Sequence, residues 1–96
     1  MAVNLAALGA RPILVSVVGR DAGGELLKDF LRKQNVDISG VAEDYDRPTT
    51  QKVRVMAEQQ QIVRFDRESK HPVAHDAAAT CMQRFKQAVQ TAKGVI

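Results

Sequence analysis

Two neighbouring stretches of the chain alternate between apolar and polar residues, and this alternation constrains the fold most strongly. Thr49–Ala57 and Gln61–Arg67 each show the period of two that is typical of a β-strand with one buried face. If the turn between them centres on Gln59, antiparallel pairing sets Val53 opposite Phe65, Val55 opposite Val63, Lys52 opposite Asp66, and Arg54 opposite Arg64. A shift of one residue would mix the apolar and charged faces, so the sequence predicts this register.

The charged face of the predicted hairpin places Arg54 directly opposite Arg64. Like charges opposite each other on a sheet repel. The pair is tolerated if both side chains extend into water. It is also tolerated if an anion lies between them, because guanidinium groups bind phosphate bidentately. The charge pattern permits both arrangements and by itself favours the solvated face, since most exposed charges are only solvated.

The rest of the chain alternates predicted helices and strands, which indicates an α/β fold containing a segment of parallel sheet. The apolar run Pro12–Val18 is typical of a strand that is buried on both faces of a parallel sheet. Asp21 is suited to cap a helix over Ala22–Gln34, and Asn35 to end it in the left-handed conformation. The other predicted elements are a helix end at Met1–Leu8, a strand at Val36–Val41, a turn at Asp44–Pro48, a helix from about Val73 to Gly94, and the start of a strand at Val95–Ile96.

Both longer helices carry an apolar stripe at helical spacing, by which we expect them to pack on the sheet. Cys81 lies on the second stripe and is the only cysteine, so no internal disulfide can form and we expect a small buried hydrophobic side chain. The stripes are Leu26, Leu27, Phe30 and Leu31 in the first helix, and Ala77, Cys81, Phe85, Val89 and Ala92 in the second.

Composition and charge narrow the possible functions. The 96 residues carry a net charge of +3 without the clustered basic face of most nucleic-acid-binding domains. No apolar run approaches the roughly 20 residues of a membrane span, and the N-terminus lacks a signal-peptide pattern. His71 and His75 lack a third ligand at a suitable spacing, so we expect no metal site. We therefore expect a cytoplasmic protein without nucleic-acid or membrane partners.

Several motifs resemble those of the ribokinase-like (PfkB) carbohydrate kinases. Leu8-Gly9-Ala10 is similar to the end of that family's first helix, and Val18-Gly19-Arg20-Asp21 to its Val-Gly-x-Asp turn. A narrower group, the heptose-7-phosphate kinases, includes the kinase domain of the bifunctional heptose kinase/adenylyltransferases. The chain resembles this group through Pro48-Thr49, Lys52-Val53-Arg54-Val55, Gln60–Asp66 and Glu68, whereas Gln59 stands where the group has Asn. The resemblance covers nearly the whole chain and weakens after Pro72.

The resemblance implies that residues 1–96 form one partial kinase domain of ribokinase-like fold, with lid strands at about 36–68 over the sugar. It implies a kinase that transfers the γ-phosphate of ATP to the anomeric hydroxyl of D-glycero-D-manno-heptose 7-phosphate, with Mg²⁺, and a homodimer formed through the lid. The implied substrate-binding residues are Lys52, Arg54, Gln60, Gln61, Arg64 and Asp66. The implied lid-packing and dimer residues are Val53, Val55, Val63 and Phe65.

The family's catalytic Gly-Ala-Gly-Asp motif and its nucleotide-binding half have no counterpart in these residues. We therefore expect a fragment that contains no catalytic residue and does not bind ATP or Mg²⁺ by itself. Two alternatives stay open. One is a non-enzymatic module that dimerises or binds a partner through the strand pair, and the other is a fragment of a fructokinase- or ribokinase-type enzyme.

Overall fold

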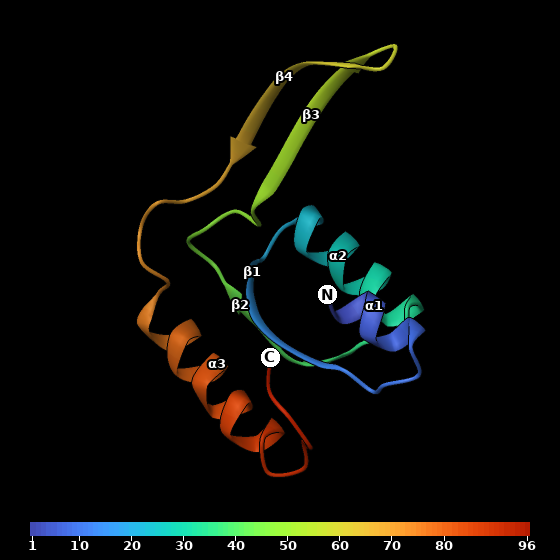
Figure 1. Cartoon of the computed structure of the whole chain (residues 1–96). Coiled ribbons are helices and arrows are strands. Elements are labelled where there is room, and N and C mark those ends of the chain that lie inside the picture. Colours follow the sequence, from blue (N-terminus) through green and yellow to red (C-terminus); the bar gives the residue numbers. More distant parts are fainter.

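The computed structural model describes residues 1–96 and contains two separate two-stranded sheets (Figure 1). In the first, β1 (Ile13–Gly19) pairs in parallel with β2 (Asp37–Asp44), and α2 (Ala22–Lys33) connects them. In the second, β3 (Gln51–Ala57) pairs antiparallel with β4 (Gln60–Arg67). The other helices are α1 (Ala2–Ala7) and α3 (His75–Ala88). This order confirms the predicted α/β class, with a parallel segment, flanking helices and a hairpin.

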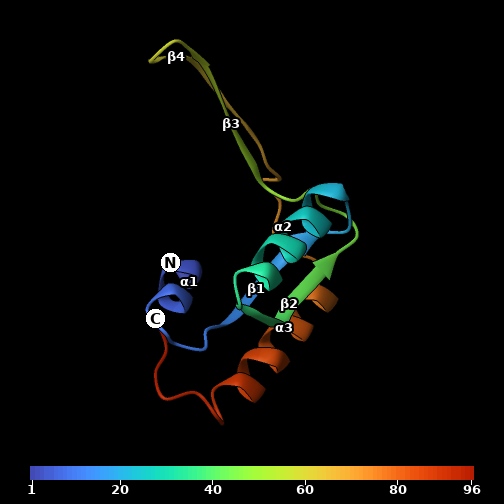
Figure 2. The same ribbon diagram turned by 90° about the vertical axis from the view of Figure 1, so that its right-hand side faces the viewer.

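The parallel strands lie between α2 on one face and α3 on the other (Figure 2). We call these four elements, β1, α2, β2 and α3, the body. Its core is small, since only 11 of 96 residues are buried. The buried hydrophobic residues are Val18, Leu31, Val36, Val41, Ala42 and Ala77.

The hairpin of β3 and β4 projects away from the body, as both views show (Figures 1 and 2). The chain therefore measures 46 × 35 × 20 Å and has a radius of gyration of 15.3 Å. A compact chain of this length would have a radius of gyration of about 12.5 Å. No residue of either hairpin strand is buried.

Three local predictions are confirmed. All four cross-strand pairs predicted for the hairpin are present, from Lys52 with Asp66 to Val55 with Val63. Asp21 is the N-cap of α2 and accepts a hydrogen bond from the amide of Gly24. Asn35 has a φ of 58°, in the left-handed region.

The lid strands begin later than the sequence predicted. Residues 36–44 do not belong to the hairpin, because β2 extends to Asp44 and pairs with β1. Asp44 ends this strand and also opens the predicted turn, since its side chain accepts from the amide of Asp46. The hairpin strands are confined to residues 51–67.

The C-terminal predictions were partly wrong. α3 ends at Ala88 and not at Gly94. The hydroxyl of Thr91 donates to the carbonyl of Ala88, a local bond of the kind that competes with helical hydrogen bonds. Val95–Ile96 forms no strand, since the β1–β2 sheet has only two members and neither pairs with it.

The predicted burial was too extensive. Residues 13–17 of β1 are half-buried, because one edge of β1 has no neighbouring strand to extend the sheet beneath the helices. In α2, Leu31 is buried but Leu26 is 73% exposed and Phe30 is 51% exposed. A sheet of two strands covers only part of the helical stripe. No helix is both long and apolar enough to span a membrane.

Candidate functional site

The charged face of the hairpin, formed by Lys52, Arg54, Arg64 and Asp66, gathers three cations around one carboxylate. Lys52 Nζ lies 2.9 Å from one oxygen of Asp66, and Arg64 Nε lies 3.8 Å from the other. The hydrogen bond from Lys52 is the main cause that lowers the pKa of Asp66, and the charges of Lys52, Arg64 and Arg54 lower it further. The carboxylate is therefore ionised at neutral pH, and the face keeps an excess of positive charge.

Arg54 is the member of the charged face without a salt bridge. It pairs in register with Arg64, whose side chain is 54% exposed. Two neighbouring guanidinium groups, one of them free of any carboxylate, offer several N–H donors to an anion with several oxygens. This face can bind a phosphate group without first breaking an ion pair of Arg54.

The two glutamines of the predicted site are not on the same face. The ladder is irregular between Val55 and Met56, so that Ile62 is an extra residue on β4. Beyond this bulge, Gln61 pairs with Met56 and Gln60 with Ala57. Opposite residues of an antiparallel pair share a face. Gln61 therefore joins the charged face, whereas Gln60 lies on the other face near the turn.

The apolar face of the hairpin is formed by Val53, Val55, Val63 and Phe65, of which Val53 is half-buried and the other three are exposed. Val55, Val63 and Phe65 are 43%, 47% and 54% exposed. The register therefore separates these four residues from all the predicted substrate-binding residues except Gln60, which shares their face. Neither face packs on the body.

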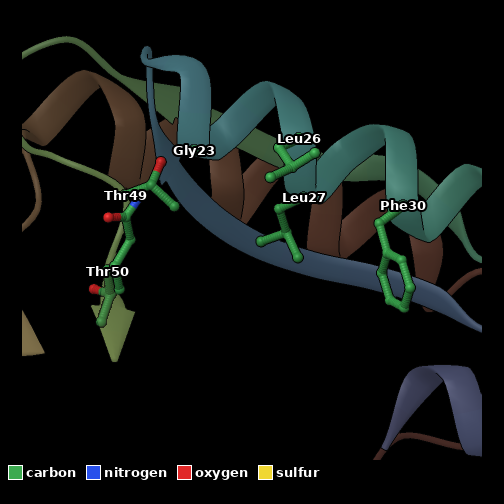
Figure 3. Close-up of a pocket in the computed structure, with 7 residues that line it drawn as sticks. Gly23, Leu26, Leu27, Phe30, Thr49 and Thr50 are labelled. Carbon is green, nitrogen blue, oxygen red and sulfur yellow. The ribbon is translucent and has the colours of Figure 1, made fainter. Parts of the chain in front are cut away.

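The base of the hairpin adjoins an open groove of about 440 Å³ (Figure 3). The exposed side chains of α2 form one wall, and residues 49–51 form the other. No charged residue lines the groove, so it is a poor site for a sugar phosphate. Its lining residues are Gly23, Leu26, Leu27, Phe30, Thr49, Thr50 and Gln51.

A polar cluster that the sequence did not predict lies at the carboxyl ends of β1 and β2. Asp21 accepts hydrogen bonds from both the hydroxyl and the amide of Thr49, at 2.6 and 2.9 Å. These bonds, with that of Gly24, lower the pKa of Asp21 to about 2. The separation of 28 residues between Asp21 and Thr49 explains why no local pattern revealed the contact, although Pro48-Thr49 stood out as a motif.

Asp44 is the second carboxylate of this cluster and is only 2% exposed. The amides of Ala74 and Asp46 donate to it and lower its pKa. The oxygens of both Asp21 and Asp44 are occupied by donors, and both carboxylates hold protons weakly, so neither is suited to act as a general base. No group of three or more His, Cys, Asp or Glu is placed to hold a metal ion.

Comparisons with known proteins agree with the features of the chain. The model of the pfkB family of carbohydrate kinases matches residues 1–95. The bifunctional protein HldE of Geobacter metallireducens is 51% identical over 73 residues, which are 76% of this chain and 15% of that protein. HldE of Helicobacter pylori strain P12 is 40% identical over 96 residues, which are 100% of this chain and 21% of that protein. HldE of Geobacter sulfurreducens is 45% identical over 76 residues, which are 79% of this chain and 16% of that protein. The chain thus spans about a fifth or less of these curated relatives.

Proposed function

The chain belongs to the pfkB family of carbohydrate kinases, and we propose from this that it forms the substrate lid and adjoining strands of a heptose-7-phosphate kinase. The proposed kinase transfers the γ-phosphate of ATP to the anomeric hydroxyl of D-glycero-D-manno-heptose 7-phosphate in the cytoplasm, for ADP-heptose and lipopolysaccharide core synthesis. The observation that carries the proposal is the charged face, where Arg54 stands beside Arg64 without a carboxylate of its own.

In this proposal the charged face binds the 7-phosphate of the sugar. Arg54 and Arg64 donate to the phosphate oxygens, and Lys52 adds positive charge from its pair with Asp66. Gln61 is placed to donate to or accept from the sugar hydroxyls. Gln60 has a different role, since its register puts it on the opposite face. We assign ATP and Mg²⁺ to the complete kinase and no residue of this chain to either.

Calorimetry on the chain with heptose 7-phosphate, unphosphorylated heptose and inorganic phosphate tests this assignment. We expect binding of heptose 7-phosphate and loss of that binding in the double variant Arg54→Ala/Arg64→Ala. Each arginine should contribute about tenfold to hundredfold, the range of hydrogen bonds to charged groups. Arg32→Ala is the matched control, because Arg32 is exposed on α2 and bonds only to Asp29. Equal affinity of the double variant and the control would contradict the proposal.

Two further measurements test which sugar is bound and whether the chain is the lid alone. Fructose and ribose, titrated in the same way, distinguish a heptose kinase from a fructokinase- or ribokinase-type enzyme. An assay of ADP release with ATP and heptose 7-phosphate tests the assignment of the chain to the lid alone. Robust turnover by these 96 residues would contradict it.

A second candidate function, dimerisation through the hairpin, is favoured by the uncovered apolar face. Phe65 is 54% exposed and lies beside the exposed Val63. A hairpin with two free edges and an apolar face gains stability by pairing with a second copy. Sedimentation equilibrium should show a dimer that Phe65→Glu dissociates, while the control Met82→Glu, on the exposed part of α3, leaves it intact. A strict monomer over a wide concentration range would exclude this function.

A further inference from the structure

The hairpin joins the body through two chain segments (Figure 1). A carboxylate of the body accepts hydrogen bonds from each segment. Residues 45–50 lead from β2 into β3, and residues 68–74 lead from β4 back to α3. No residue of the hairpin strands is buried, and of their side chains Gln51 at the base lies near Gly23 of α2, so packing contributes little to the direction of the hairpin. Its position depends on how these two segments are held.

The outgoing segment is held by Asp21. One oxygen of Asp21 accepts from the hydroxyl of Thr49 at 2.6 Å and from the amide of Gly24 at 2.8 Å. The other accepts from the amide of Thr49 at 2.9 Å. The hydroxyl of Thr49 in turn accepts from the amide of Gly19 at 3.0 Å. Thr49 is only 7% exposed and stands two residues before β3, so the start of the hairpin is bonded to the end of β1 and the first turn of α2.

The returning segment is held by Asp44. One oxygen accepts from the amide of Ala74, the N-cap of α3, at 2.9 Å. The other accepts from the amide of Asp46 at 2.9 Å. Arg47 on the outgoing segment also donates to the carbonyl of Ser69 on the returning one, at 3.5 Å. The two segments are therefore tied to the body and to each other.

Asp44 ends β2, and Asp21 follows the end of the paired strand β1 by two residues. Gly19, two residues before Asp21, pairs in register with Asp44, and the amide of Arg20 donates to the carbonyl of Asp44. Two neighbouring fixed points restrict a rigid hairpin far more than one, because a single point permits rotation in every direction. Charge-assisted hydrogen bonds of this kind are stronger than neutral ones.

We propose that Asp21 and Asp44 are positioning residues that hold the hairpin at one fixed angle to the parallel strands, with Thr49 as the link to β3. Thr49 lies three residues before Lys52, the first member of the charged face. The fixed angle therefore presents Lys52 and Arg54 in a constant place. This last consequence rests on the proposed function, whereas the fixed angle does not.

Distance measurements between spin labels test the fixed angle without any sugar phosphate. One label is placed at the hairpin turn by Gln59→Cys and the other at the end of α2 by Lys33→Cys, in a Cys81→Ala background. We expect a single narrow distance peak in this parent. Thr49→Val keeps the shape of the side chain but removes its hydroxyl, and we expect loss of the narrow peak. Thr49→Ser keeps the hydroxyl and should restore the peak.

Thr50→Val is the matched control, because it makes the same change at the neighbouring exposed residue, whose hydroxyl bonds to nothing. A narrow peak in folded Thr49→Val, or a parent peak as broad as that of Thr49→Val, would overturn the proposal. If circular dichroism shows that Thr49→Val is unfolded, the same distance is measured in Asp44→Asn. The asparagine side chain has one carbonyl oxygen in place of the two carboxylate oxygens of Asp44, so it loses one of the two bonds to amides. An unchanged narrow peak in Asp44→Asn would then overturn the proposal, and a broadened peak would support it. Failure of heptose 7-phosphate to bind would contradict only the proposed function.

Discussion

The body and the hairpin are stabilised by different physical means. All 11 buried residues lie outside the two hairpin strands, and the body is stabilised by burying apolar side chains between two layers of helix. The hairpin depends on its ladder, on cross-strand pairs and on the segments that join it to the body. An isolated two-stranded hairpin is marginally stable in water. The hairpin strands therefore stay without buried residues, while the body supplies the hydrogen bonds that anchor them.

The largest expected effect comes from removing a buried side chain of the body. Leu31 is 6% exposed between α2 and the sheet, so Leu31→Ala should destabilise the chain by about 2–5 kcal/mol. Phe65→Ala, on the hairpin, should change the free energy of unfolding by no more than about 0.5 kcal/mol. Urea unfolding, at a concentration where the chain is monomeric, measures both values.

These two variants test directly whether the body and the hairpin are stabilised differently. A cost of Phe65→Ala equal to that of Leu31→Ala would mean that the hairpin is part of the same packed unit as the body. The stated contrast between the two regions would then be wrong, and the exposed apolar face would be a structural surface rather than a binding surface.

The second-largest change in the free energy of unfolding is expected where the body meets the segment before β3. A Cβ atom at Gly19 would lie 2.4 Å from the carbonyl oxygen of Arg47 and 2.5 Å from the amide nitrogen of Thr49. Both neighbours are backbone atoms, so Gly19→Ala should cost about 1–3 kcal/mol as the segment before β3 is displaced. Gly94→Ala is the control, since no atom lies within 4 Å of the added methyl group. Equal urea midpoints for the two variants would show that the close approach at Gly19 is not maintained in solution.

The sequence predicted the hairpin well because its register depends on local information. Alternation in Thr49–Ala57 and Gln61–Arg67 permits only one pairing that separates apolar from charged residues, and that pairing is observed. The fine detail near the turn was not predictable. The bulge at Ile62 follows from the two-residue turn, in which Glu58 adopts a φ of 53°, and a Glu in that conformation has no clear sequence signal.

The sequence was less informative wherever the structure depends on distant contacts. Asp21 was identified as a helix cap, but its bonds to Thr49 depend on the parallel strands bringing the two together. Asp44 was identified as a turn residue, and it does accept from the amide of Asp46, but its burial and its bond to Ala74 leave no trace in neighbouring residues. The apolar stripe of α2 predicted burial that a two-stranded sheet cannot provide for Leu26.

Acid should weaken the anchors selectively. The pKa of Asp21 is lowered from 3.8 to about 2 by bonds from Thr49 and Gly24 and by the charge of Arg67, and that of Asp44 is lowered by amide bonds and Arg47. Between these two pKa values the unfolded chain binds more protons than the folded chain. The stability that ionised Asp21 contributes is therefore present above about pH 3.8 and is lost as the pH falls through 2. Urea midpoints at stepped pH should fall steeply in the parent and less steeply in Asp21→Asn. Asp29→Asn, on the exposed face of α2, should retain the parent slope.

The smallest effect is expected within the charged face and should differ in sign between two neighbouring residues. Arg54 faces Arg64, and removing one member of a like-charged pair relieves repulsion, so Arg54→Thr should stabilise the hairpin by about 0.2–1 kcal/mol. Lys52→Thr removes an attractive pair with Asp66 and should destabilise it by a similar amount. Hydrogen exchange of the β3 and β4 amides measures both changes. If Arg54→Thr slows exchange but also weakens phosphate binding, the repulsive pair of Arg54 and Arg64 lowers stability and serves phosphate binding. Faster exchange in both variants would mean that the arginines do not repel and that the face is only solvated.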